Sequence, residues 1–156
     1  MTGIFDAMAA RTRKVDGKPT SLLDVGYNNA GLDDAWQACG AGEKGTFYGA
    51  DGKPMINTTT FPDMKAMVDH GHHLGLHIGF YLNNCICGMA PGTFNASFVD
   101  KIYAGCVDTV VENGFDGVKF DSCSPFHNMT RWASLLAAAN HPTLDENCHN
   151  SDFQVP

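Results

Sequence analysis

The stretch FPDMKAMVDHGHHLGLHIGFYL, residues 61–82, joins a helical segment to a short apolar strand and sets the pattern for the rest of the chain. It predicts a helix over 61–74 and a strand over 76–82. The same alternation predicts helices over 94–113 and 128–140 and strands over 27–34, 116–121 and 143–147. Strands that alternate with helices form parallel sheets, so the expected fold class is α/β.

Within this pattern the sequence also indicates where elements stop. The helix over 94–113 carries an apolar residue at every fourth position, which predicts a buried stripe made of Phe94, Phe98, Ile102, Cys106 and Val110. Asn113-Gly114 is a plausible helix stop. The connection from Gln37 to Thr60 is rich in glycine and should be a long loop.

Polar residues follow each expected strand at its carboxyl end. They are Asp33-Asp34, Asn83, Asp121 and Glu146. A single carboxylate at a strand end usually only caps the next loop, but polar ends in four successive units predict a ligand site, because parallel strands bring these ends to one edge. We therefore expect Asp33, Asp34, Lys119 and Asp121 to lie at the same edge of one sheet.

The net charge of -7 argues against nucleic acid as a partner, because such binding depends on clustered lysine and arginine. No run of apolar residues is long enough to span a bilayer, and no apolar segment follows the basic residues near the N-terminus. Neither a membrane span nor a signal peptide is expected in this chain.

Six cysteines are many for a cytosolic chain of 156 residues, and Asn57, Asn95 and Asn128 stand in glycosylation triplets. Both features favour a secretory compartment. The cluster of His70, His72, His73 and His77 resembles a metal site, but its spacing provides no convincing third ligand. No metal and no cofactor are expected.

Three segments carry a family resemblance: GYNNAGLDDAW at 26–36, FPDMKAMVDHGHHLGLHIGFY at 61–81 and DGVKFDSC at 116–123. In this order they resemble glycoside hydrolase family 27, the α-galactosidase and α-N-acetylgalactosaminidase family. The resemblance implies a partial TIM (β/α)8 barrel of about four to five βα units, a retaining exo-acting α-galactosidase, and a terminal α-galactoside as substrate.

The resemblance also implies roles for individual residues. Asp121 matches the catalytic nucleophile, and Lys119 lies two positions earlier on the same strand face, where its ammonium would keep the carboxylate ionised. Asp33 and Asp34 would accept hydrogen bonds from sugar hydroxyls, O4 and O6 of the galactose. The other substrate-binding residues that it implies are Trp36, Tyr81, Cys123 and Glu146. Trp36 has an equally good interpretation as plain core.

Cys87 and Cys123 align with a family disulfide that ties the loop after the third strand to the nucleophile loop, although Cys85 is a competing partner that sequence cannot exclude. Ala35 stands where many members have a cysteine, and Cys39 could substitute. The surroundings of Glu146, DENCH, differ from the SCEW of the family.

Relative to a complete barrel, we expect residues 1–156 to form a single partial catalytic domain that lacks the first strand and strands six to eight. The general acid/base of the family, an Asp on the sixth strand, would then be absent, so this chain alone should not turn over α-galactosides at a rate typical of the family. The alternative hypothesis is a non-catalytic carbohydrate-binding remnant of such an enzyme, and a third hypothesis is an unrelated α/β protein. The resemblance implies a secreted, lysosomal or vacuolar protein, and an open half-barrel could pair as a homodimer.

Overall fold

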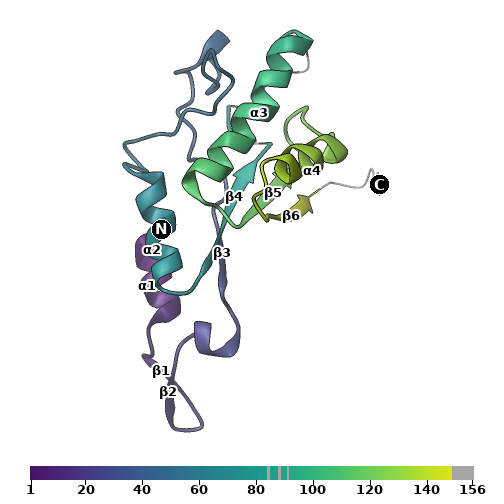
Figure 1. Cartoon of the computed structure of the whole chain (residues 1–156). Coiled ribbons are helices and arrows are strands. Elements are labelled where there is room, and N and C mark those ends of the chain that lie inside the picture. Colours follow the sequence, from purple (N-terminus) through teal and green to yellow (C-terminus); the bar gives the residue numbers. More distant parts are fainter. Residues whose placement is uncertain (84, 88, 91, 149–156) are drawn as a thin grey trace.

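The centre of the fold is a four-stranded parallel sheet in the order β3-β4-β5-β6 (Figure 1). The computed structural model describes residues 1–83, 85–87, 89–90 and 92–148. The strands are β3 (Asn29–Gly31), β4 (His77–Leu82), β5 (Gly117–Asp121) and β6 (Leu144–Cys148). The helices between them are α2 (Met64–His73), α3 (Ala96–Asn113) and α4 (Met129–Ala138). The predicted alternation and the α/β class are confirmed.

Each of these three helices begins at a polar side chain that accepts a hydrogen bond from the first turn. Asp63, Asn95 and Asn128 accept from the backbone N–H groups of Ala66, Phe98 and Arg131, respectively. Such caps satisfy donors that have no partner inside the helix. At the other end of α3, Gly114 adopts a φ of 78°, which confirms the predicted stop after Asn113.

One face of the sheet packs against the helices and forms the core. Ile78 and Phe80 of β4 and Val118 and Phe120 of β5 alternate with residues of the other face and are almost fully buried. The helices come close: a Cβ on Gly71 of α2 would lie 2.4 Å from Cδ1 of Ile78, so a larger residue here would require the Ile78 side chain to shift. Of the predicted stripe on α3, Ile102, Cys106 and Val110 are buried, whereas Phe94 and Phe98 are partly buried.

The opposite face of the sheet is open. Gly31, Gly79 and Gly117 lie beside one another in register on β3, β4 and β5, next to Leu144 of β6. They line a cavity of about 580 Å³ together with Asp33, Lys119 and Glu146. Leu144 is 71% exposed there.

The N-terminal region contains elements that the sequence analysis did not predict. Helix α1 (Thr2–Ala9) is followed by a hairpin of β1 (Arg13–Val15) and β2 (Lys18–Thr20), and then by the 3-10 helix η1 (Leu23–Val25). Asp16 and Gly17 form the hairpin turn with φ angles of 50° and 77°. Asp-Gly is a strong hairpin signal, so the sequence did contain the information.

The connection from Gln37 to Thr60 is a loop, as predicted, with a single 3-10 turn, η2 (Glu43–Gly45). Two isolated bridges, Gln37 to Ile56 and Tyr48 to Pro54, fold the loop back on itself. Its Phe47 and Tyr48 are buried in the core.

Among the helices of the described residues, none has the length and apolar character needed to cross a membrane.

Candidate active site

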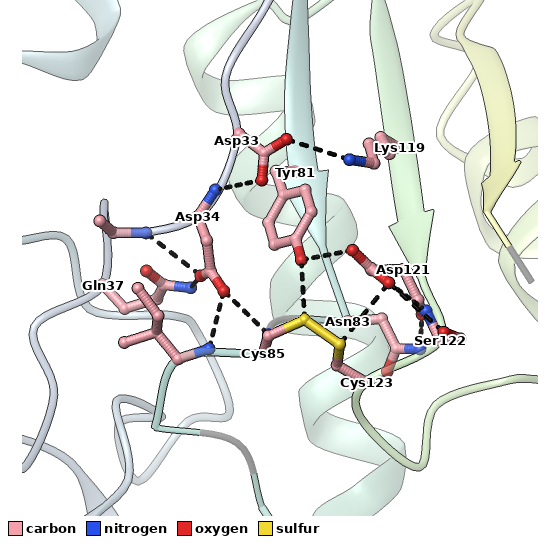
Figure 2. The surroundings of a disulfide bond; sticks show 12 residues. Asp33, Asp34, Gln37, Tyr81, Asn83, Cys85, Lys119, Asp121, Ser122 and Cys123 are labelled. Atoms are coloured by element: carbon pink, nitrogen blue, oxygen red, sulfur yellow. Dashed lines mark hydrogen bonds and ion pairs between the residues drawn. A yellow bond between two sulfur atoms is a disulfide. The ribbon is translucent and has the colours of Figure 1, made fainter. Parts of the chain in front are cut away.

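The carboxyl ends of β3, β4 and β5 bring four of the predicted residues together (Figure 2). Lys119 Nζ lies 3.0 Å from Asp33 Oδ2, and the Tyr81 hydroxyl donates to Asp121 Oδ2 at 2.6 Å. Tyr81 and Lys119 are register partners on neighbouring strands, and Asp121 ends β5. The prediction that Asp33, Asp34, Lys119 and Asp121 share one edge of a parallel sheet is confirmed.

Asp121 is held by hydrogen bonds to both of its carboxylate oxygens. Oδ2 accepts from the Tyr81 hydroxyl, and Oδ1 accepts from the backbone N–H of Ser122 at 2.6 Å. The main-chain carbonyl of Asp121 accepts a hydrogen bond from the side-chain NH₂ of Asn83. The side-chain carbonyl of Asn83 in turn accepts from the backbone N–H of Phe126. The strand end and its carboxylate are therefore fixed in one orientation, as charge-assisted hydrogen bonds are short and directional.

Tyr81 provides the most buried contact of this carboxylate. The side chain is 1% exposed, and burial, followed by the hydrogen bond to Asp121, raises the pKa of its hydroxyl. The hydroxyl is therefore protonated near neutral pH. It can act only as a donor to Asp121.

Lys119 makes its ion pair with Asp33. The hydrogen bond to Asp33 raises the pKa of the ammonium, and the more distant Asp121 adds a smaller effect in the same direction. The ammonium also lies 5.0 Å from the centre of the Tyr81 ring, which is a cation–π distance. Lys119 thus lies at the same edge as Asp121, as predicted, and its direct partner is Asp33.

The Asp33 carboxyl has a lowered pKa, first because the Asp34 N–H donates to it and second because Lys119 does. We expect Lys119→Met to raise this pKa towards its ordinary value of about 3.9 without reaching it, because the Asp34 N–H remains. Because the pKa of Asp33 is lower in the folded chain than in the unfolded chain, this carboxyl stabilises the fold at pH values above its pKa in the unfolded chain. The contribution is lost as the pH falls through its pKa in the folded chain. It should be small, since the Asp33 side chain is 72% exposed.

An NMR titration of the Asp33 carboxyl carbon measures this directly. Lys53→Met, which removes an ion pair to Glu112 elsewhere, is the matched control and should leave the Asp33 titration unchanged. If the midpoint of the Asp33 titration is the same in Lys119→Met and in the parent chain, Lys119 does not contribute to the lowered pKa of Asp33.

The carboxylate of Asp34 accepts hydrogen bonds from four groups of this chain. Oδ1 accepts from the side-chain amide of Gln37 and from the N–H of Ala35, and Oδ2 accepts from the N–H groups of Cys85 and Ile86 at 3.0 and 2.7 Å. Gln37 is 3% exposed and was not identified from the sequence, where nothing distinguishes it from other loop residues. Its Oε1 atom has no hydrogen-bond partner among the described residues.

For Trp36 the structure selects the core interpretation. The residue is 0% exposed and packs against Phe80 and Phe47, with ring centroids at 4.6 and 5.7 Å. Its indole N–H donates to the carbonyl of Tyr81 at 3.0 Å. No face of the ring is open, so its expected direct contact with a sugar is wrong.

Glu146 lies on β6 in register with Lys119, so the two side chains are neighbours on the open face of the sheet. It is exposed and lines the cavity with Asp33 and Lys119, whereas Tyr81 and Asp121 do not line it. The predicted contact of Glu146 with the sugar stays a prediction.

The predicted pairing of Cys87 with Cys123 is wrong. Cys123 is bonded to Cys85, with the two Cα atoms 4.8 Å apart, and Cys87 is bonded to Cys39. Asp34 accepts a hydrogen bond from the backbone N–H of Cys85, while Cys87 adopts a φ of 47° and the chain turns towards the loop of Cys39. Cys39 therefore does enter a disulfide, as the Ala35 substitution suggested.

The sulfur of Cys123 lies 3.6 Å from Asp121 Oδ1, and that of Cys85 lies 3.3 Å from the Tyr81 hydroxyl. Among the described residues, Cys85, Asp121 and Cys123 are the one group whose ligand atoms are close enough for a metal ion. Metal binding by cysteine requires a thiolate, and both sulfurs are in the disulfide. Only the carboxylate of this group could bind a metal. Two histidines of the predicted cluster bind carboxylates instead: His70 binds Asp6, and His72 binds Asp116.

The sequence is similar to α-galactosidases. It is 31% identical over 140 residues to a protein named probable alpha-galactosidase A from Aspergillus fumigatus, covering 80% of this chain and 24% of that protein. It is 30% identical over 143 residues to alpha-galactosidase A from Cellvibrio japonicus, covering 86% of this chain and 32% of the relative. The chain thus spans about a quarter to a third of the curated relatives it matches. No family model matches the sequence.

Solved structures share the fold. The α-galactosidase from Saccharomyces cerevisiae with raffinose superposes with a TM-score of 0.65 at 18% identity, covering 95% of this chain and 30% of that one. A protein from Bacillus halodurans assigned as an α-N-acetylgalactosaminidase gives a TM-score of 0.63 at 12% identity, covering 96% of this chain and 43% of that one. At these identities the likeness concerns the fold, which is that of a partial TIM barrel.

Proposed function

We propose that this chain is part of a retaining exo-glycosidase that hydrolyses terminal α-D-galactosyl residues, because it belongs to glycoside hydrolase family 27 and carries part of its (β/α)8 barrel. The single observation that carries this proposal is the environment of Asp121. Its carboxylate ends a parallel strand at the ligand-binding edge, and Tyr81, Ser122 and a disulfide hold it in one orientation.

In the proposed reaction, Asp121 attacks the anomeric carbon of the bound galactoside, and the glycosidic oxygen leaves. A covalent glycosyl-enzyme forms, and water then hydrolyses it with overall retention of configuration. The hydrogen bonds from Tyr81 and Ser122 aim the carboxylate, so that little rearrangement is needed when the bond forms.

Asp33 and Lys119 are the proposed ligands of the sugar hydroxyls. Each Asp33 oxygen accepts one protein hydrogen bond, from Lys119 or from the Asp34 N–H, and a carboxylate oxygen can accept a second. The Lys119 ammonium has three protons, and its hydrogen bond to Asp33 uses one of them. Glu146 lies beside Lys119 and would extend this surface. A carboxylate and an ammonium side by side can bind two neighbouring hydroxyls.

We further propose that the general acid lies outside these 156 residues. Asp33 has a lowered pKa and is ionised near neutral pH, so it is a poor proton donor. Retaining glycosidases require a second carboxyl group about 5–5.5 Å from the nucleophile, and this second group must carry a proton that it gives to the leaving oxygen.

Residues 1–156 would then be one partial catalytic domain. If the chain binds galactose but never reacts with it, the alternative of a carbohydrate-binding remnant is correct.

The test of the proposal uses the purified chain and nitrophenyl α-galactoside, whose leaving group needs little protonation. We expect slow release of nitrophenol, and we expect Tyr81→Phe to slow it by about 10-fold to 100-fold, the effect of losing a hydrogen bond to a charged group. Tyr27→Phe, at a tyrosine that is 66% exposed, is the matched control and should react like the parent chain. If the parent chain releases no nitrophenol, the proposed role of Asp121 as nucleophile is contradicted. If Tyr81→Phe releases it as fast as the parent chain, the proposed role of Tyr81 is contradicted.

Two disulfides in the described residues fit an oxidising compartment, so we propose a secreted or vacuolar protein. The homodimer suggested by the open face of the sheet stays a prediction.

A further inference from the structure

We propose that Asn95 and Asn128 carry N-linked glycans while the same two side chains cap the helices α3 and α4. Each stands in an Asn-x-Ser/Thr triplet, the acceptor motif for N-glycosylation, which Ser97 and Thr130 complete. The inference uses the proposed secretory compartment, and it does not depend on which residue is the catalytic nucleophile.

The first argument is that both triplets are accessible. Asn95 and Asn128 are exposed, and so are the hydroxyl residues of their triplets. A glycan is bulky and polar, so the fold can accommodate it only where it extends into solvent. Asn57, in the third triplet, is half-buried, and its backbone N–H donates to the carbonyl of the fully buried Trp36 at 2.8 Å. The proposal is therefore confined to the two exposed triplets.

The second argument is that the cap and the glycan use different atoms of each side-chain amide. Oδ1 of Asn95 accepts from the backbone N–H of Phe98 at 2.9 Å, and Oδ1 of Asn128 accepts from that of Arg131 at 2.9 Å. Neither Nδ2 atom donates a hydrogen bond to an acceptor among the described residues. Because an N-linked glycan is attached through Nδ2, the lone pairs of Oδ1 remain available to the helix.

The contrast with asparagines outside the triplets shows what a glycan would otherwise disrupt. Nδ2 of Asn83 donates to the carbonyl of Asp121, and Nδ2 of Asn113 donates to the carbonyl of Thr109 at 2.7 Å. A glycan on either nitrogen would replace a proton of an NH₂ group that holds a strand end or a helix end. No such hydrogen bond is at risk at the two capping asparagines.

The glycosyl transfer replaces one proton of the NH₂ group. The donor is an oligosaccharide linked to a lipid diphosphate. The bond from its anomeric carbon to the diphosphate oxygen breaks, and that carbon forms a bond to Nδ2. The lipid diphosphate leaves with the bonding electrons, and Nδ2 gives one proton to a base of the transferase. In the product, oxygen and nitrogen can no longer exchange places without moving the glycan, so the capping acceptor is fixed.

Both glycans would lie on the helix layer of the fold. α3 follows β4 and α4 follows β5, so both helices begin on the side of the carboxyl edge of the sheet (Figure 1). The two helices are joined by the ion pair of Arg131 with Asp100 at 2.6 Å. Neither capping asparagine lines the cavity on the opposite face of the sheet. The glycans would therefore leave the open face of the sheet uncovered.

The sites are located by producing the chain in a eukaryotic cell behind a cleavable signal peptide and purifying it from cells and medium together. Transfer precedes secretion, so slow secretion does not hide the result. Peptide N-glycosidase in water enriched in heavy oxygen converts each glycosylated asparagine into an aspartate that carries the isotope. We expect tandem mass spectrometry to find the isotope at positions 95 and 128. Its absence from either position would overturn the proposal for that asparagine.

Substitution of the hydroxyl residues removes the glycans and keeps the caps. Ser97→Ala and Thr130→Ala should each lower the mass of the intact glycoprotein by one glycan. Ser134→Ala, which removes an exposed hydroxyl from α4 outside any triplet, is the matched control and should keep both glycans. An unchanged number of glycans in Thr130→Ala would show that Asn128 is not an acceptor, and the same result in Ser97→Ala would exclude Asn95.

The capping role is measured on the chain made in bacteria that lack the transferase. Asn128→Ala removes the acceptor and should raise the equilibrium constant of unfolding by about 2-fold to 30-fold. Asn128→Asp keeps an oxygen acceptor at the helix start and should not raise it. Equal constants for Asn128→Ala and the parent chain would overturn the capping role.

Hydrogen exchange decides whether cap and glycan coexist. The backbone amides of Phe98 and Arg131 should exchange no faster in the glycoprotein than in the bacterial chain, because Oδ1 still accepts from them. Faster exchange in the glycoprotein would show that the glycan displaces the cap, and would overturn that part of the inference. None of these measurements involves catalysis, so their failure and the failure of the proposed function are distinguishable.

Discussion

Asp121→Asn is expected to reduce nitrophenol release from nitrophenyl α-galactoside by about 10³-fold or more, down to the uncatalysed rate. An amide cannot form the covalent bond to the anomeric carbon on which the proposed reaction depends. The change keeps the shape of the side chain, and an Oδ atom can still accept from the Tyr81 hydroxyl or the Ser122 N–H, so the fold should survive.

The matched control is Asp69→Asn, which makes the same change on α2 in an exposed ion pair with Lys65. It should release nitrophenol at the rate of the parent chain. If Asp121→Asn reacts as fast as the control, Asp121 is not the nucleophile.

The second large effect concerns the leaving group. Without a proton donor, an alkyl galactoside must release an alkoxide, and general acid catalysis is commonly worth about 10²–10⁴ in rate. We therefore expect the chain to react with methyl α-galactoside at least that much more slowly than with the nitrophenyl substrate. Hydration of Asp121 at the open face of the sheet should slow the reaction of both substrates, because water weakens the electrostatic interactions of a site.

Both substrates are compared with the same preparation, so that protein folding and concentration cancel. Rapid hydrolysis of methyl α-galactoside would overturn the prediction, because a residue within these 156 would then have to supply the proton.

The edge of the sheet and its polar residues could be predicted from the sequence for a simple physical reason. Parallel strands that alternate with helices bring their carboxyl ends together whatever the loops do. Lys119 and Asp121 follow from this rule and from the two-residue period of a strand. Helix starts such as Asp63 and the stop at Gly114 follow from local chemistry that the sequence displays directly.

The disulfides could not be predicted in the same way. Cys85 and Cys87 are separated by one residue in a loop, and their direction depends on backbone angles and on Asp34, which approaches from more than 50 positions earlier in the chain. Family alignment suggested Cys87 as the partner of Cys123, and the structure assigns Cys85.

The different hydrogen-bond partners of Asp33 and Asp34 were also beyond the sequence. Both are carboxylates at one strand end, and the family resemblance assigns both to the sugar. What separates them is the set of donors that reach them: Lys119 binds Asp33, whereas the loop after β4 binds Asp34. Only tertiary structure brings these groups together.

The most direct test of the central claim, that Asp121 is a glycosidase nucleophile, is the position of the covalent adduct. The parent chain is incubated with a fluorinated α-galactosyl fluoride that forms a long-lived covalent adduct, digested and analysed by tandem mass spectrometry. The proposed function predicts one fluorogalactosyl group per chain, attached to Asp121 and absent from Asp121→Asn. A label on another residue, or an unlabelled parent chain, would contradict it.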